Sequence, residues 1–179
     1  MLLNPALDPE LMRLALLEAE AALLEREVPV GCVFASPSPA APFFLLAAAH
    51  NRTNASFDPT RHAEMVALDA IGEGLSLEDL RALLASATLC VTVEPCLMCA
   101  DALMRAGVGR IVFGCPNDKF GGCGTVLDVV GGKVPLTRGV RAEEAVALLK
   151  RFYARPNVRT AAAAAGAGGG EGGGEGAQP

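Results

Sequence analysis

Two short segments of this 179-residue chain carry side chains of the types that bind zinc in proteins. One contains His62 and Glu64, and the other contains Cys96 and Cys99, directly after Pro95. Two thiolates and one imidazole give zinc three ligands, and a hydrolytic zinc site keeps its fourth position for water. Glu64 is not needed as a ligand, so its carboxylate is available to take a proton from that water and pass it to a substrate. These residues predict a catalytic zinc site.

A purely structural zinc site is the alternative interpretation. Such a site closes its metal with four protein ligands. A fourth ligand would have to come from His50, the only other histidine, or from a thiol such as Cys115 or Cys123. Because a structural site leaves Glu64 without a role, we favour the catalytic interpretation.

The starts of two helices are expected to position the ligands. Cys96 and Cys99 are three residues apart at the beginning of a helix expected over residues 95–106, so their sulfur atoms share one face. The electropositive helix N-terminus favours the thiolate form that zinc needs. His62 lies in the same way at the start of a helix expected over residues 61–71. Zinc would therefore join two helix N-termini.

Strand-like and helix-like patterns alternate along the rest of the chain. Strands are expected at residues 28–34, 43–49, 88–93 and 110–113, the first two joined by a proline-rich turn. Further helices are expected at residues 9–26, 75–84 and 143–153. The first of these helices is predicted to bury a stripe formed by Leu11, Leu14, Leu17, Ala21 and Leu24. The alternation indicates an α/β layer fold whose second half is largely parallel.

Composition indicates one folded domain and a tail. Hydrophobic residues make up 51% of the chain, and we expect residues 1–159 to form the domain. Residues 160–179 are almost entirely Ala, Gly and Glu, and we expect a disordered tail. No apolar run reaches the ~20 residues of a membrane span. The acidic residues near the N-terminus fit neither a secretory signal nor a mitochondrial presequence. We expect a cytoplasmic and/or nuclear protein with no membrane partner.

The cysteines outside the zinc motif are predicted to be packed thiols. Cys32 and Cys90 lie in apolar, strand-like runs and are expected to be buried. Cys115 and Cys123 flank a glycine-rich loop. Ordinary packing is favoured for this second pair, while a second metal or a disulfide stays open.

The net charge is −5 at pH 7. Affinity for nucleic acid rests largely on the neutralisation of phosphates, so an acidic chain is poorly suited to hold RNA alone. A nucleic-acid substrate would require help from a partner.

Around the zinc motif the sequence resembles the tRNA-specific adenosine deaminases. The resemblance rests on residues 28–31, 51–52, 60–65 and 92–100. Residues 113–127 are more similar to the catalytic subunit of the eukaryotic enzyme than to the bacterial homodimeric enzyme. The likeness covers roughly residues 9–153. It implies a three-layer cytidine-deaminase-like α/β fold, with a central mixed sheet of about five strands and helices on both faces.

The resemblance implies hydrolytic deamination of adenosine to inosine at the wobble position of the tRNA anticodon. His62, Cys96 and Cys99 would bind Zn²⁺, and Glu64 would shuttle protons to the flipped-out base. The tRNA substrate would be shared with a related, catalytically inactive deaminase subunit in a heterodimer, with a homodimer as the alternative.

The resemblance also implies substrate contacts. Asn51 would hydrogen-bond the flipped base, although a turn-forming asparagine explains it too. Val30 would line the pocket, although a buried strand valine explains it equally well. Backbone N–H groups at Ala63 and near Cys96 would stabilise the reacting centre. The expected RNA contacts are Asn117, Lys119, Lys150, Arg151 and Arg155.

Two other functions are consistent with the same motif. A deaminase of a free base or nucleoside, such as cytosine, cytidine or guanine, would use identical metal chemistry. A non-catalytic, zinc-bearing subunit of an editing complex would need no Glu64. The chain also departs from the eukaryotic family in its C-terminal part, where a basic extension is reduced to Lys150, Arg151, Arg155 and Arg159.

Overall fold

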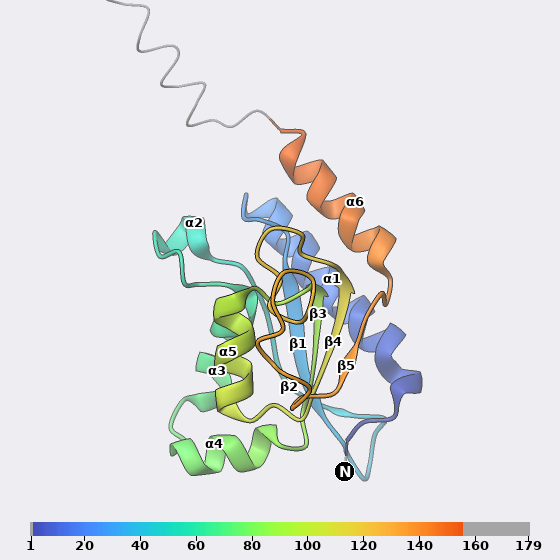
Figure 1. Ribbon diagram of the computed structural model, residues 1–179, viewed down its shortest axis with the longest axis vertical. Helices are drawn as coiled ribbons and strands as arrows, with labels where there is room; N and C mark the ends of the chain where they lie inside the picture. The colour runs from blue at the N-terminus through green and yellow to red at the C-terminus, as the bar shows by residue number, and fades with distance from the viewer. Residues whose placement is uncertain (1, 156–179) are drawn as a thin grey trace, which may run out of the picture.

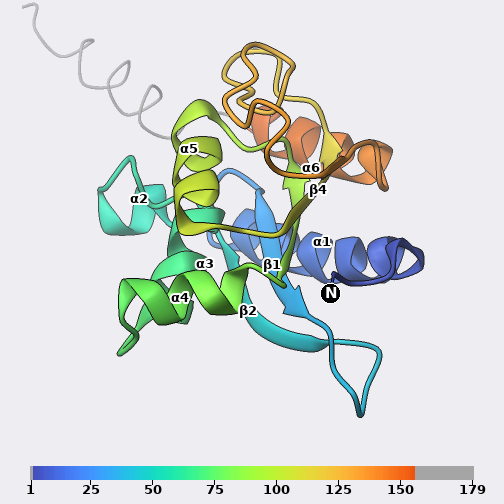
Figure 2. The same cartoon turned by 60° about the horizontal axis from the view of Figure 1, so that its bottom comes forward.

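The computed structural model describes residues 2–155, which form a mixed five-stranded sheet covered by helices on both faces (Figures 1 and 2). The strands are β1 (Gly31–Ser36), β2 (Phe44–His50), β3 (Thr88–Val93), β4 (Arg110–Cys115) and β5 (Leu136–Thr137), in the spatial order β2-β1-β3-β4-β5. Strand β1 pairs antiparallel with β2 and β3, whereas β3, β4 and β5 are parallel. The expected three-layer fold with a parallel second half is confirmed.

The helices divide between the two faces of the sheet. They are α1 (Asp8–Leu24), α2 (Thr53–Ser56), α3 (Ala63–Gly72), α4 (Leu77–Leu84), α5 (Leu97–Ala106) and α6 (Ala142–Tyr153), preceded by a 3₁₀ turn at Pro5–Leu7. Helices α1 and α6 cover one face, and α3, α4 and α5 cover the other (Figure 2). Within residues 2–155, no helix is both long enough and apolar enough to cross a bilayer.

Two hydrophobic cores follow from this arrangement. Side chains alternate along β1, so Cys32 and Phe34 enter the core under α3, α4 and α5, while Val33 and Ala35 enter the core under α1. Strands β1, β3 and β4 are buried along their whole length. A strand that is covered on both faces usually has a mostly apolar sequence without alternation, and the sequences of β1, β3 and β4 are of this type.

The predicted apolar stripe of α1 was partly wrong. Leu17 is 50% exposed and Leu24 is 83% exposed, whereas the adjacent Leu16 and Leu23 are buried. An α-helix turns about 100° per residue, so steps of three residues fall about 60° short of a full turn. Two such steps from Leu11 carry the predicted stripe out of the core.

Several element boundaries differ from the sequence prediction. Strand β5 was not located, because two residues inside a glycine-rich segment carry no periodicity. Helix α5 begins at Leu97 with Cys96 as its N-cap residue, so Pro95 precedes the helix instead of opening it. The segment between β2 and α3, for which no helix was predicted, contains the single turn α2. The predicted tail at residues 160–179 lies outside the described residues, as does Arg159.

A buried ion pair ties the start of α1 to the parallel edge of the sheet. Arg110 donates from Nη1 to Asp8 Oδ1 at 2.8 Å, and its Nη2 contacts both Asp8 Oδ2 and Thr137 Oγ1. The two charged side chains are 7% and 5% exposed. Burying two charges is favourable only when each one satisfies the other.

Removing one member of this pair should therefore destabilise the protein strongly. Arg110→Met leaves the Asp8 carboxylate buried without its partner, and we expect a loss of about 3–5 kcal/mol in the free energy of unfolding. Urea denaturation followed by circular dichroism measures it. The double variant Asp8→Leu/Arg110→Met should regain most of the loss, because no unpaired charge stays buried. A loss below about 1 kcal/mol in Arg110→Met would contradict the assignment.

Candidate active site

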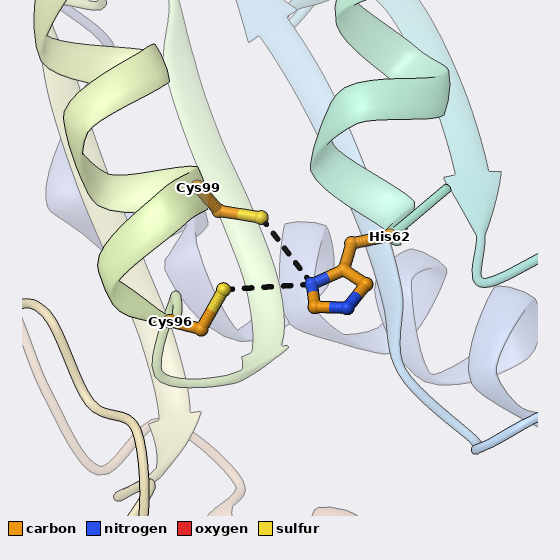
Figure 3. Close-up of side chains that lie close together, drawn as sticks. All are labelled: His62, Cys96 and Cys99. Atoms are coloured by element: carbon orange, nitrogen blue, oxygen red, sulfur yellow. Dashed lines mark hydrogen bonds between the residues drawn. The ribbon is translucent and has the colours of Figure 1, made fainter. Parts of the chain in front are cut away.

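Three potential metal ligands meet where α3 and α5 begin (Figure 3). His62 is the N-cap residue of α3, Cys96 is the N-cap residue of α5, and Cys99 lies in the first turn of α5. His62 Nδ1 lies 3.5 Å from each of the two sulfur atoms. All three ligand atoms lie within 4.8 Å of one another. The structure thus brings together the three ligands predicted from the sequence.

The donor set fits zinc. Bond lengths of about 2.0 Å to nitrogen and about 2.3 Å to sulfur, at a tetrahedral angle, place the two ligand atoms about 3.5 Å apart. The observed distances from His62 Nδ1 to Cys96 Sγ and Cys99 Sγ have this value. In the part of the chain that the structure describes, no fourth His, Cys or acidic residue joins the group. This is the open type of site that leaves a position for water.

Electrostatics favour metal binding at Cys96. A hydrogen bond from Cys99 lowers the pKa of Cys96 to about 4, with a further contribution from the His62 ring. The Cys99 pKa is correspondingly raised, because its thiol proton is the one shared with Cys96. One of the two sulfurs is therefore a thiolate at neutral pH, which is the form that ligates zinc.

Glu64 lies in the first turn of α3, two residues after His62, and is 3% exposed. Burial raises its pKa to about 7, with a smaller contribution from the negative charge on Cys96. A carboxyl group that titrates near neutrality can both accept and donate a proton. Its position and chemistry are those expected of a proton shuttle.

Asn51 fixes the backbone between the histidine and the glutamate. It is buried, and its Oδ1 accepts a hydrogen bond from the Ala63 N–H at 2.9 Å. The Asn51 N–H donates in turn to the Val30 carbonyl at 3.1 Å. This bond sets the orientation of the side-chain amide, and Nδ2 is the atom of Asn51 that can donate to a ligand.

Two residues expected to contact substrate, Ala63 and Val30, take part in these hydrogen bonds through their backbones. The N–H of Ala63, expected to stabilise the reacting centre, already donates to Asn51. Its role toward a substrate stays a prediction. Val30 is half-buried between the two cores and positions Asn51 through its carbonyl group, so its side chain has a packing role as well.

Two of the expected RNA contacts, Asn117 and Arg155, make hydrogen bonds within the chain, and Arg155 is exposed as well. Asn117 Oδ1 accepts from the Phe120 N–H, and Arg155 donates to the Leu23 carbonyl at the end of α1. Lys119, Lys150 and Arg151 are exposed. Lys150 and Arg151 lie in the last turn of α6. In Figure 1, the end of α6 and the start of α5 both lie toward the top of the molecule.

Two buried carboxylates, Glu27 and Glu94, were given no role from the sequence. Glu27 is fully buried and accepts hydrogen bonds from Thr53 Oγ1 and from the N–H groups of Asn54 and Ala55, which caps α2. Glu94 is 2% exposed and accepts three N–H groups from the loop after β4. Glu94 directly precedes Pro95 in the zinc motif, which was the only available signal.

The remaining thiols are packed. Cys32, Cys90, Cys115 and Cys123 are all buried and form no disulfide. Burial raises the pKa of Cys123 to about 12 and that of Cys115 above its ordinary value. Ordinary packing, which the sequence favoured, is what the structure shows for these four thiols.

Residues 5–115 match the family model of the cytidine and deoxycytidylate deaminase zinc-binding region. The chain belongs to this deaminase family. Zinc is its cofactor. Among the described residues, the three-ligand group favours the catalytic interpretation over the purely structural zinc site.

Two curated proteins that are similar to this chain are named tRNA-specific adenosine deaminases. The chain is 42% identical over 145 residues to "tRNA-specific adenosine deaminase 2" of Danio rerio, covering 76% of this chain and 65% of that protein. It is 39% identical over 153 residues to "tRNA-specific adenosine deaminase subunit tad2" of Schizosaccharomyces pombe, covering 83% of this chain and 37% of that protein. The chain thus spans less than two thirds of both relatives.

A solved structure has the same fold. It comes from studies of A-to-I editing by tRNA:A34 deaminases at the wobble position of transfer RNA. The TM-score is 0.65 at 30% sequence identity, covering 78% of this chain and 99% of that chain.

The zinc ligands can be tested without any substrate. Cys96→Ser replaces a thiolate with a weakly binding hydroxyl, and we expect zinc content to fall from about one ion per chain to a small fraction of that value. Inductively coupled plasma mass spectrometry of the purified protein measures it. Cys90→Ala, which removes a buried thiol of β3, is the matched control and should retain the metal. Full zinc occupancy in Cys96→Ser would contradict the ligand assignment.

Proposed function

We propose that this chain deaminates adenosine to inosine at the wobble position of tRNA, as the catalytic subunit of a heterodimer in the cytoplasm, the nucleus or both. The observation that carries the proposal is the buried Glu64 beside an open His62–Cys96–Cys99 donor set. Such a set supports hydrolytic deamination in general. The choice of tRNA adenosine is supported by the names of the relatives.

His62, Cys96 and Cys99 would hold the zinc. When bound, zinc lowers the pKa of a water ligand to about 7, so that a nucleophile is available at neutral pH. Glu64 accepts a proton from the water and donates it to N1 of adenine as the water oxygen adds to C6. It then takes the remaining hydroxyl proton and gives it to the amine, which leaves C6 as ammonia. Glu64 ends the cycle in its starting state, and the product is inosine.

Asn51 orients the base in this scheme. Its Oδ1 is held by the Ala63 N–H, so the orientation of the side-chain amide is fixed before substrate enters. Nδ2 is then the donor for a ring nitrogen of the flipped base. A preorganised donor of this kind selects for the base without moving during the reaction.

Replacing the proton shuttle should abolish turnover while the metal stays bound. For Glu64→Gln we expect the editing rate to fall by about 10²–10⁴-fold, the usual contribution of general acid–base catalysis. Inosine at the wobble position is read by sequencing an adenosine-wobble tRNA, and zinc content is measured in parallel. Cytidine, cytosine, guanine and adenosine are assayed alongside with the unmodified protein. Turnover of a free base or nucleoside in place of the tRNA would overturn the proposed substrate.

A partner subunit is proposed because the chain offers few groups for phosphate. The net charge is −5. The basic side chains expected to contact RNA, Lys119, Lys150, Arg151 and Arg155, are exposed and give four positive charges for a polyanion. A related deaminase subunit with a basic surface would supply the rest.

This requirement predicts weak editing by the chain alone. We expect the isolated protein to edit tRNA at least about tenfold more slowly than its mixture with the related subunit, because each additional phosphate contact strengthens binding. Single-turnover editing at two salt concentrations tests this. Robust activity of a purified homodimer, with no gain from the second subunit, would contradict the heterodimer.

A further inference from the structure

The loop between β4 and β5 is fastened to the zinc-ligand segment by one buried carboxylate. Glu94 Oε2 accepts the Asn117 N–H at 3.1 Å, and Oε1 accepts the N–H groups of Cys123 and Thr125 at 2.9 and 3.1 Å. Glu94 is 2% exposed, so little water competes for these bonds. A single side chain thereby holds both ends of the segment 117–125.

The main chain adds contacts at the same place. The Gly122 N–H donates to the Pro95 carbonyl, and the Leu97 N–H donates to the Phe120 carbonyl, both at 2.9 Å. A Cβ atom on Gly121 would lie 2.7 Å from Glu94 Oε2. The loop therefore lies directly on the carboxylate, with no space for a side chain between them.

Glu94 is held to the end of β4 and lies close in sequence to the metal ligands. Its N–H donates to the Cys115 carbonyl at 2.9 Å, and it lies two residues before the ligand Cys96. The loop presents Lys119 and Phe120 to solvent, Phe120 being 62% exposed. A displacement of the loop would move these two side chains relative to the zinc ligands.

We infer that Glu94 is a positioning residue that sets the loop 117–125 at a fixed place beside the metal, where Lys119 and Phe120 contact the nucleotides next to the reacting base. The identity of that ligand as RNA rests on the proposed function. The glutamate acts through the backbone of the loop and touches no substrate. Fixing the loop in advance lowers the entropic cost of binding, since the loop need not be ordered when RNA arrives.

Glu94→Gln separates this role from simple folding. The substitution keeps the size of the side chain but replaces one acceptor oxygen with an NH₂ group, which cannot accept an N–H. Hydrogen exchange followed by mass spectrometry should show peptides covering residues 117–125 exchanging at least about tenfold faster. Zinc content and the visible spectrum of the cobalt-substituted protein should be unchanged. With the assembled enzyme, we expect KM for tRNA to rise at least about fivefold and kcat to change less than about twofold.

Two further variants make the test specific. In Gly121→Ala, the added methyl group would clash with the Glu94 carboxylate and displace the loop. This variant should show the same faster exchange, although Glu94 and the metal ligands are unchanged. Glu27→Gln is the matched control, since Glu27 is also a buried carboxylate that accepts backbone N–H groups. It should speed exchange near residues 53–55 and leave 117–125 at the wild-type rate.

Wild-type exchange in residues 117–125 of Glu94→Gln would overturn the inference. Loss of zinc in this variant would also overturn it, because Glu94 would then serve the metal site itself. The exchange measurements need no substrate. If the enzyme edits no tRNA, the proposed function fails while the exchange result still decides whether Glu94 holds the loop.

Discussion

The site depends on the convergence of two helix N-termini on one metal ion. Zinc bond lengths vary by only about 0.2 Å, so the starts of α3 and α5 must be held side by side to that tolerance. Cys96 follows β3 by three residues, and His62 follows β2 through the loop that contains α2. Strand β1 lies between β2 and β3 and pairs with both. The sheet thereby sets the separation of the two helices.

Buried polar side chains complete this arrangement around the metal. Asn51 holds the backbone at the start of α3, and Glu94 holds the loop beside the start of α5. Glu27 caps α2 in the segment that leads to His62. Each of these groups is buried, and a buried polar atom without a partner is costly, so each one specifies a single position for its loop. Rigid walls of this kind suit a reaction in which a base must be held against a fixed nucleophile.

Reaction and binding place different demands on the chain. Glu64 is buried, and the three metal ligands are buried or half-buried. All four residues lie within residues 51–99. Binding a polyanion requires positive charge spread over a surface, and an acidic chain has little of it. This contrast explains why the catalytic residues stand out in the sequence while the RNA contacts do not.

The sequence by itself determined the ligands, the proton shuttle and the order of helices and strands. Each is encoded locally, by residue type at short spacing or by hydrophobic periodicity. It did not locate β5, whose two residues carry no pattern. It misplaced part of the buried face of α1, because successive steps of three residues drift around the helix. Glu94 was visible beside Pro95, but its role was not. Its partners lie 23 to 31 residues away, and only the packing of the loop brings their N–H groups to its carboxylate. Tertiary structure alone also decided that the Ala63 N–H belongs to Asn51, because that bond requires the end of β2 to lie against the start of α3.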